Sequence, residues 1–364
     1  MQKVYIYLEN GTFLEADSFG ANTTAIGKLV YNNATFGQQE IITDPSNSGL
    51  FINFTAAEIG NSGANLTDME SSKAQAIGIL VRNYHDKYSN YRATMSLAEF
   101  LKEQNLLGIC NIDTRFLTKI LREEGSQMMI ASTSISSKDE LAKKLNEAKK
   151  YDETNFIELS STKEPYVHKQ GIWNPETGEF NKANMSDKKV LVLDFGTNKT
   201  FLNNLVESGF EVEVVPHNTN IDEIIEKYNS KKIDAVALSS GAGNPNIYKN
   251  EIESIKKLIS LDIPIIAVGL GHYLLALASG IKLEKIKAIK SGSHPVKGEK
   301  SVNIDSINTE YSIKEFDNIA KSLFTKVFNN QTIALKYNTK NIISSEFTPE
   351  FNSSIYKEFT SFIK

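Results

Sequence analysis

Cysteine is almost missing from this sequence. Its 364 residues include one cysteine, Cys110, so no disulfide can form within the chain and no thiolate metal cluster can be built. Any thiol chemistry would have to use Cys110. This residue lies in a short apolar run, Gly108 to Ile112, and a buried cysteine acts as a small hydrophobic side chain. We therefore assign Cys110 to the core.

Histidine clusters, excess charge of one sign and long apolar runs are also lacking. The five histidines have no i, i+4 spacing that would place two imidazoles on one helix face, which disfavours a zinc site. A net charge of -4 gives no basic field for nucleic acid or an anionic membrane. No apolar run could span a bilayer, and no signal-like segment follows Met1. We expect a cytoplasmic protein that binds no metal, nucleic acid or membrane.

The length indicates two domains, because 364 residues exceed what one core usually organises. Residues 1–150 read as a strand-rich α+β domain. The polar stretch 151–188 lacks any sustained period and has the composition of a linker, with Trp173 anchoring it against a domain. Residues 189–364 form the second domain. In the first domain the pattern predicts strands at 4–8, 13–16, 28–31 and 50–54, and helices at 97–104, 114–124 and 138–149.

The second domain alternates buried strands with helices. Val190 to Asp194 is a continuous apolar run, followed by a helix from Lys199 to Ser208, and the pattern repeats with strands at 211–215, 233–238 and 263–268. This order predicts an α/β fold with a doubly wound, mostly parallel sheet. Ligands of such sheets bind beyond the carboxyl ends of the strands. The segments to search are therefore 239–246 and 269–272.

Two of these strand ends carry glycine-rich motifs. Ser239-Ser-Gly-Ala-Gly-Asn-Pro245 follows one strand, and Gly269-Leu-Gly-His-Tyr-Leu-Leu-Ala-Leu-Ala278 follows the next. They resemble two signatures of class I glutamine amidotransferases: a loop that supplies backbone N–H donors, and a sharp strand-to-helix elbow that presents a cysteine.

Six segments of the first domain, in order, narrow the family. They are Gly27-Lys-Leu-Val-Tyr-Asn, Gln39-Glu-Ile-Ile-Thr-Asp-Pro-Ser46, Ile59-Gly-Asn-Ser-Gly63, Glu70-Ser-Ser72, Ser89-Asn-Tyr-Arg92 and Asn111-Ile-Asp-Thr-Arg115. Together they resemble the small subunit of carbamoyl-phosphate synthetase. That resemblance implies a large-subunit partner, which uses ATP and bicarbonate, and no cofactor in this chain. It also implies a place in arginine and pyrimidine synthesis.

The catalytic positions of that family are altered here. Glutamine hydrolysis in the family uses a cysteine thiolate with a histidine and a glutamate, because a nucleophile needs a base beside it. The family's Gly-x-Cys-x-Gly-His reads Ala267-Val-Gly-Leu-Gly-His272, which places Gly269 at the nucleophile position. The family's His-Pro-Glu reads Thr348-Pro-Glu350, so a hydroxyl replaces the general base and only Glu350 is retained. We expect glutaminase activity to be absent.

The glutamine pocket has changed as well. Tyr273 replaces a glutamine of the family, and Glu310 stands where a glycine gives backbone access to the substrate. A bulky ring and an added carboxylate should disfavour glutamine. The pocket positions implied by the resemblance are Ser46, Gly241, Gly243, Leu270, Tyr273, Asn308, Glu310 and Tyr311.

Structural roles also account for several of these residues. Gly269 could simply relieve a strained elbow, and His272 inside the following helix is expected to pack or cap. Glu350 without its histidine would be a structural carboxylate. Asp113 and Arg115 are expected to start a helix and to form a local ion pair. Each of these interpretations leaves the triad incomplete.

Three hypotheses remain open. The first is a subunit without glutaminase activity that binds and stabilises or regulates an ammonia-using large subunit. The second is an active amidotransferase with a substitute nucleophile, for which the hydroxyls of Ser239, Ser240 and Thr348 are candidates without an activating histidine. The third is a binding module outside this complex, in which the altered pocket accepts another small ligand.

Overall fold

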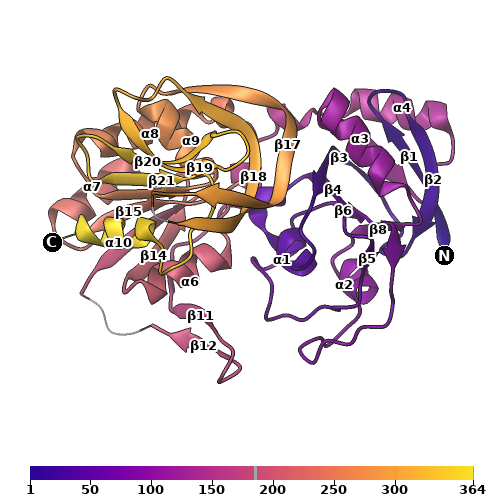
Figure 1. Cartoon of the computed structure of the whole chain (residues 1–364), viewed down its shortest axis with the longest axis horizontal. Coiled ribbons are helices and arrows are strands. Elements are labelled where there is room, and N and C mark those ends of the chain that lie inside the picture. The colour runs from indigo at the N-terminus through magenta and orange to yellow at the C-terminus, as the bar shows by residue number, and fades with distance from the viewer. Residues whose placement is uncertain (184–186, 300, 364) are drawn as a thin grey trace. The chain divides into compact units, whose positions relative to one another are not determined.

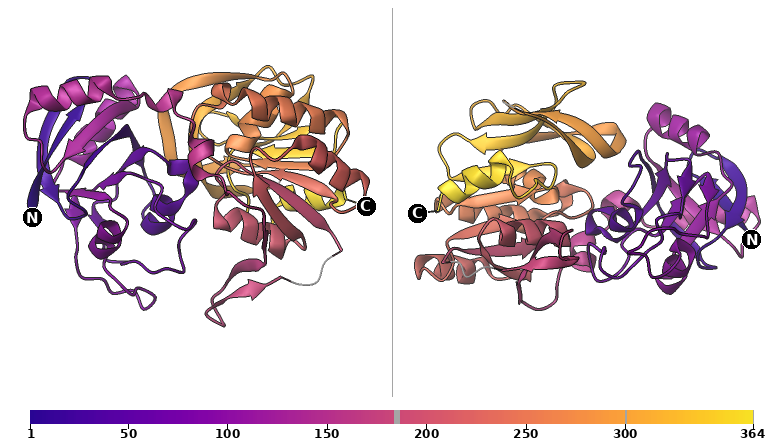
Figure 2. Two further views of the ribbon diagram at one scale, coloured as in Figure 1. Left: turned by 180° about the vertical axis from the view of Figure 1, so that it is seen from behind. Right: turned by 60° about the horizontal axis from the view of Figure 1, so that its bottom comes forward.

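A computed structural model describes residues 1–183, 187–299 and 301–363. The chain forms two compact units. Unit 1 comprises Met1–Thr154 with Ile286–Ser293, and unit 2 comprises Asn155–Lys285 with His294–Lys364. Figures 1 and 2 show the chain coloured along its length. The chain first passes from unit 1 to unit 2 after Thr154, and it returns to unit 1 once, for eight residues.

Seven strands of unit 1 form a closed ring of hydrogen-bonded neighbours. They are β1 (Gln2–Leu8), β2 (Phe13–Ser18), β3 (Thr24–Asn32), β4 (Leu50–Phe54), β6 (Gly78–Leu80), β8 (Leu107–Cys110) and β9 (Gln127–Ser132). β3, β4, β6 and β8 run parallel in that order. Antiparallel pairs β8–β2, β2–β1, β1–β9 and β9–β3 complete the ring. β5 (Glu58–Ile59) and β7 (Asn83–Tyr84) form a separate parallel pair.

Alternation along β1 shows how this ring is filled. Val4, Ile6 and Leu8 point into the core of unit 1, whereas Tyr5 and Tyr7 pack outside against a helix. Because successive side chains of a strand point to opposite faces, β1 contributes both to the core of the ring and to the packing of the helix outside it.

Cys110 at the end of β8 is buried as predicted, and burial raises the pKa of its thiol to about 11. The helices of this unit are α1 (Gln38–Thr43), the 3₁₀ turn η1 (Pro45–Asn47), α2 (Leu97–Glu103), α3 (Thr114–Glu124) and α4 (Lys138–Glu147).

Unit 2 is built on one mixed sheet. Its strands are β10 (Tyr166–His168), β13 (Lys189–Asp194), β14 (Glu211–Pro216), β15 (Ala235–Leu238), β16 (Ile265–Val268), β17 (Lys282–Lys297), β19 (Ala320–Lys326), β20 (Thr332–Tyr337) and β21 (Ile342–Ser345). The parallel part has the order β14–β13–β15–β16–β21. β10 extends one side antiparallel to β14, and β20, β19 and β17 extend the other side. β18 (Val302–Lys314) also belongs to this unit.

Both faces of the parallel strands are buried, which confirms the predicted doubly wound fold. In β13, Leu191 and Leu193 enter one core while Val190 and Val192 enter the other. Helices α7, α8 and α9 cover the first face, and α6 and α10 cover the second, as Figure 1 shows. The helices are α6 (Lys199–Glu207), α7 (Ile221–Asn229), α8 (Lys249–Ser260), α9 (Leu270–Ala278) and α10 (Ser354–Ser361), with the 3₁₀ turn η3 (Pro245–Ile247).

The stretch 151–188, predicted as a linker, contains secondary structure. β10 pairs with β14, and its largely exposed side chains explain why no apolar period reveals it. Trp173 packs edge-on against Phe180, 5.1 Å between ring centroids, within a hairpin whose Asn181 donates to the Glu207 carboxylate of α6. The cited link from this hairpin to α6 is made by Asn181, and the anchoring role predicted for Trp173 stays a prediction. Residues 184–186 lie outside the described residues. The elements are η2 (Tyr151–Glu153), α5 (Phe156–Ser160), β10, β11 (Gln170–Asn174) and β12 (Glu179–Lys182).

The carboxyl ends of the parallel strands meet at one edge of the unit 2 sheet. Asp194 ends β13, Ser239 follows β15, Gly269 follows β16, and Glu346 follows β21. The strand order changes direction between β13 and β15, the place where such sheets usually bind ligands. No helix within the described residues is long and apolar enough to cross a membrane.

We predict that Gly271→Ala will lower the free energy of unfolding by about 2 kcal/mol, because an added methyl overpacks the contact between α9 and β15. A Cβ at position 271 would lie 2.5 Å from the carbonyl oxygen of Leu238 and 2.7 Å from that of Ser239. Urea unfolding followed by circular dichroism measures the change.

Gly280→Ala serves as the control for this prediction. A Cβ at position 280 meets no atom within 4 Å, so only the backbone strain at φ 83° contributes. We expect a cost of about 1 kcal/mol for a non-glycine residue in this region. Equal losses in the two variants would show that the close contact at Gly271 is unimportant.

Candidate functional site

The elbow between β16 and α9 is formed by backbone alone. Gly269 has φ 54° and ψ -119°, outside the region that side-chain-bearing residues prefer. Its N–H donates to the Ser345 carbonyl, 3.0 Å, which ties the elbow to the end of β21. A Cβ at position 269 would lie 3.0 Å from the Ser240 Cβ. The elbow therefore faces the loop after β15, as the sequence predicts.

The glycine-rich loop after β15 is tightly held. The Ser239 hydroxyl donates to the Ser240 carbonyl, 2.9 Å, and accepts from the Phe195 N–H, 2.8 Å. A Cβ on Gly241 would lie 2.3 Å from the Phe195 carbonyl oxygen and 3.0 Å from Leu270 Cδ2. Gly241 and Leu270 are therefore neighbours.

Two of the predicted pocket positions carry buried tyrosines that contact each other. Tyr273 and Tyr311 are only 5% and 4% exposed, and their rings meet edge to face with centroids 5.9 Å apart. The Tyr273 hydroxyl donates to the Tyr311 carbonyl, 3.2 Å. The Tyr311 hydroxyl donates to Asn244 Oδ1, 3.0 Å, just after Gly243. We call Tyr273, Tyr311 and Asn244 the tyrosine plug. It links α9, β18 and the loop after β15.

The other predicted pocket positions belong to β18, to the loop after β15 and to unit 1. Glu310 on β18 pairs with Lys285 at 3.2 Å, and its side chain is 12% exposed. Asn308 lies two residues earlier on the same strand. Gly243 has φ 98°, and a Cβ there would lie 2.5 Å from the Tyr248 hydroxyl. Ser46 belongs to unit 1, in η1, where Asp44 accepts from its N–H at 2.8 Å. Its role toward glutamine stays a prediction.

The segment after β21 carries the remaining triad positions. Thr348 is half-buried and Glu350 is exposed, while the Pro349 carbonyl accepts from Asn204 Nδ2, 2.9 Å. Burial, together with the charge of Glu350, raises the pKa of Asp305 to about 6. Glu350 therefore lies near a second carboxylate.

A buried ion pair braces the same segment. Lys326 Nζ lies 3.1 Å from Glu346 Oε1, and both side chains are at most 5% exposed. It joins the end of β19 to the residue after β21. Removing one partner of such a pair leaves an uncompensated buried charge, which is strongly destabilising. Sequence reasoning missed this pair, because twenty residues separate its members and neither has a local signal.

His272 makes a second contact that the sequence did not reveal. Its Nδ1 lies 2.8 Å from the Ser344 hydroxyl on β21, and the imidazole is fully buried. Burial lowers the pKa of His272 to about 3, so the ring stays neutral at ordinary pH. The pair combines a hydroxyl with an imidazole, but burial of both residues closes it to a substrate. The expectation that His272 packs inside the helix is confirmed.

The interpretation of Arg115 is wrong in one respect. α3 begins at Thr114, as predicted, because the Asp113 carboxylate accepts from the N–H groups of Arg115 and Phe116. Among the described residues, however, the Arg115 guanidinium has no ion-pair partner, Asp113 included. The Asp113 carboxylate accepts hydrogen bonds from the backbone and forms no ion pair with the Arg115 side chain.

Comparison with known proteins agrees with this arrangement. Residues 6–131 match the family described as carbamoyl-phosphate synthase small chain, CPSase domain, and residues 191–362 match glutamine amidotransferase class-I. The carbamoyl phosphate synthase small chain of Campylobacter jejuni is 42% identical over 98% of this chain and 99% of its own length. The chain belongs to the carbamoyl-phosphate synthase small-chain family.

Other members of the small-chain family cover the chain to a similar extent. The carbamoyl phosphate synthase small chain of Helicobacter hepaticus is 40% identical over 96% of this chain and 94% of its own length. That of Helicobacter pylori is 39% identical over 99% of both. These matches confirm the resemblance stated from the six segments and the two glycine-rich motifs.

The chemistry available to this family member follows from its side chains. Position 269 offers no nucleophilic atom, and position 348 offers a hydroxyl, which cannot accept a proton near neutral pH. The described residues contain no cluster of three or more His, Cys, Asp or Glu side chains arranged for a metal ion. The roles assigned to Gly269, Thr348 and Glu350 stay predictions.

We predict that stability will depend on pH through His272. Below pH about 6.5 the unfolded chain binds a proton at this imidazole that the folded chain excludes, so stability falls as the pH falls. Between pH 7 and pH 5 the loss is expected to be about 2 kcal/mol. Urea unfolding of the unmodified chain and of His272→Asn at both pH values measures it.

The comparison isolates His272 because the other groups are common to both proteins. Burial also lowers the pKa of His168, but that contribution is present in both and cancels. Equal losses of stability in the two proteins would show that His272 takes up its proton in the folded state.

Proposed function

We propose that this chain is the subunit of a carbamoyl-phosphate synthase that binds the large subunit and that it does not hydrolyse glutamine. The large subunit would then use free ammonia, together with ATP and bicarbonate, and this chain would carry no cofactor. The expected setting is arginine and pyrimidine synthesis in the cytoplasm. Near-complete alignment with proteins named as small chains supports the partner.

The observation that carries the loss of activity is Gly269. A class I amidotransferase forms its thioester on the side chain at the elbow, and this residue has none. Thr348 removes the base that would activate a nucleophile. Loss of one triad member is already severe for a catalytic unit of this kind, and here two positions are changed.

The tyrosine plug supports the same proposal from the side of binding. Tyr273 and Tyr311 are buried against each other, and the Tyr311 hydroxyl donates a hydrogen bond to Asn244 Oδ1. If glutamine occupied the positions that the resemblance implies, it would have to displace these contacts and the Glu310–Lys285 pair. Binding would therefore cost the energy of these interactions.

A substitute nucleophile is the second candidate, favoured only by the nearness of Ser240 to the elbow. Its hydroxyl donates to the Gly196 carbonyl, 3.2 Å, and the Ser239 hydroxyl is held by two backbone groups. Neither serine has a histidine among its described hydrogen-bond partners. A covalent adduct of either serine with a glutamine-like electrophile, located by mass spectrometry, would establish this alternative.

A third function, a small-ligand module outside the complex, makes a different prediction about partners. Such a protein would not co-purify with a carbamoyl-phosphate synthase large subunit. Co-purification therefore separates this alternative from the two that place the chain in the complex.

We predict that the chain, co-purified with its large subunit, will support carbamoyl-phosphate synthesis from ammonium but not from glutamine. Initial rates with each nitrogen donor measure this, with the large subunit alone as the control. Glutamine-dependent synthesis by the unmodified complex would contradict the proposal and would mean that a residue other than Gly269 carries the chemistry.

We predict that restoring the triad positions alone will restore little activity. Gly269→Cys with Thr348→His supplies a nucleophile and a base but leaves the tyrosine plug and Glu310 in place. Adding Tyr273→Gln and Glu310→Gly is expected to raise glutamine hydrolysis at least tenfold over the double variant. Glutamate release measures each rate.

The control for this series carries Gly269→Ser in place of Gly269→Cys with the other three substitutions unchanged. The serine hydroxyl at position 269 is a much poorer nucleophile than a cysteine thiolate, so we expect no glutamate release above background. If the double variant already matched the quadruple variant, the plug would have no part in excluding glutamine.

A further inference from the structure

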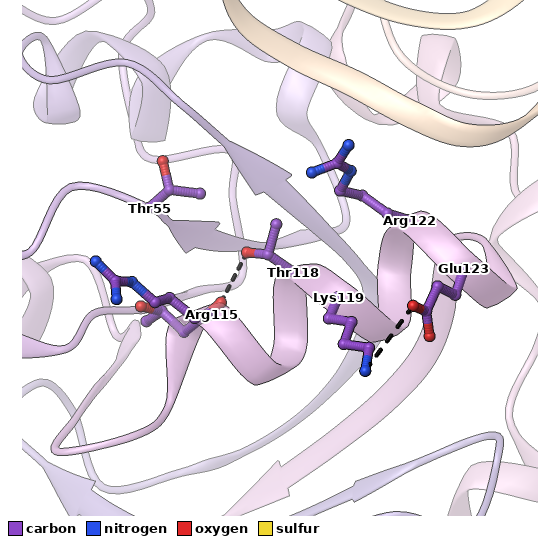
Figure 3. Close-up of a pocket in the computed structure, with 7 residues that line it drawn as sticks. Thr55, Arg115, Thr118, Lys119, Arg122 and Glu123 are labelled. Atoms are coloured by element: carbon purple, nitrogen blue, oxygen red, sulfur yellow. Dashed lines mark hydrogen bonds and ion pairs between the residues drawn. The ribbon is translucent and has the colours of Figure 1, made fainter.

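A cationic cavity lies on unit 1, and none of its described lining residues is a predicted triad or glutamine-pocket position. Its volume is about 560 Å³, which is within the range of small-ligand sites. The cavity opens over α3 and the end of β4, as Figure 3 shows. Its lining residues are Thr55, Thr114, Arg115, Thr118, Lys119, Arg122 and Glu123. We call this group the α3 cradle.

Three cations line one face of α3. Arg115, Lys119 and Arg122 follow i, i+4, i+7 spacing, which places them in a row along the helix. The opposite face, with Leu117 and Leu121, is buried in the core of unit 1. The row is therefore held at the surface by the packing of the helix beneath it.

The charges of the cradle are largely uncompensated. Among the described lining residues Glu123 is the one acidic residue, and Lys119 lies 4.0 Å from it in a well-exposed pair of small energetic value. Within the described parts of the chain, Arg115 and Arg122 have no acidic partner. Two guanidinium groups thus remain available in a protein whose net charge is -4.

The floor of the cradle is rigidly built. Asn53 on β4 is fully buried and donates through Nδ2 to the Thr114 carbonyl, 3.1 Å, and to the Thr118 hydroxyl, 2.9 Å. The Thr118 hydroxyl donates in turn to the Thr114 carbonyl, 2.7 Å. α3 is thereby fixed to β4, and the exposed Thr55 hydroxyl follows that strand on the same side.

The spacing of the two arginines indicates the length and the charge of the ligand. Seven residues of α-helix separate them by about 10 Å along the axis, so one monovalent anion cannot engage both at full strength. Guanidinium groups bind phosphate and carboxylate in a bidentate manner. None of the described lining residues is aliphatic or aromatic, so the cavity offers no large apolar side chain to hold a hydrophobic ligand. An elongated small molecule with several phosphate groups meets these requirements.

We propose that the α3 cradle is a binding site for a small polyphosphate ligand, an inorganic polyphosphate or the phosphate chain of a nucleotide. Arg115 and Arg122 grip separate phosphate groups, and the Thr55 hydroxyl donates to an oxygen between them. Lys119 adds charge at the centre of the row. The site is independent of the proposed function in unit 2.

Calorimetric titration of the full chain tests this proposal, with inorganic tripolyphosphate as the first probe and ATP without magnesium as the second. Binding is expected to weaken as salt is raised, since the groups are exposed. Arg115→Gln and Arg122→Gln are each expected to weaken binding about tenfold, and the double variant about a hundredfold. Orthophosphate is expected to bind much more weakly than tripolyphosphate.

Lys143→Gln with Lys144→Gln on α4 is the matched control, because both lysines are exposed and the change in net charge is the same. It should leave binding within about twofold. If this control weakened binding as much as the double arginine variant, the effect would come from the overall charge of the protein, and the proposal would be overturned.

Two further results bear on the ligand class. Binding of tripolyphosphate but not ATP would keep the site and restrict it to inorganic chains. If the unmodified chain bound neither probe, while Arg115→Gln with Arg122→Gln weakened association with the large subunit, the cradle would be a protein interface and the proposal would be overturned. Ammonium-dependent synthesis by the complex can be measured separately, so the two proposals fail independently.

Discussion

The close approach of α9 to β15 at Gly271 determines the carboxyl edge of the unit 2 sheet. The Gly271 N–H donates to the Ser239 carbonyl, 3.0 Å, and the carbonyl oxygens of Leu238 and Ser239 leave no room for a side chain. The helix therefore begins directly at the strand end, with Gly269 between β15 and β21. These contacts are made by backbone atoms. A side chain at position 269 meets the unusual φ of the elbow and the close approach of Ser240, whereas the backbone contacts that hold the elbow do not depend on that side chain.

The sequence predicted those features that arise from local patterns. The apolar runs of β13 and β16, the Asp113 cap of α3 and the glycine-rich loops all have signals within a few residues. β10 was missed because three largely exposed residues at a sheet edge have no apolar period. The His272–Ser344 and Lys326–Glu346 pairs were missed because each joins residues that only the folded sheet brings together. The resemblance to a family indicated pocket positions, but it could not show that Tyr273 and Tyr311 pack against each other.

The ionisable groups near the elbow of unit 2 and those on α3 of unit 1 differ in burial. In unit 2 the ionisable groups near the elbow are shielded: His272 is neutral, and Lys326 and Glu346 neutralise each other. On α3 of unit 1 the guanidinium groups stay in water, and their charge is available to a ligand. The surroundings rather than the residue types set this contrast, since a buried charge must be paired or discharged whereas an exposed one need not be.

The return of the chain to unit 1 at Ile286–Ser293 affects how the protein is made. Within unit 1, Ser291 on β17 pairs with Asn32 on β3, whose Nδ2 donates to the Ser291 hydroxyl, 3.0 Å. Residues 291 and 32 are separated by most of the chain, and closing so long a loop is entropically costly and slow. During synthesis, unit 1 cannot complete these contacts until residue 293 has left the ribosome. Folding of unit 1 is therefore completed only after most of unit 2 has been translated. A chain that ended between residues 154 and 286 would contain unit 1 without the segment Ile286–Ser293.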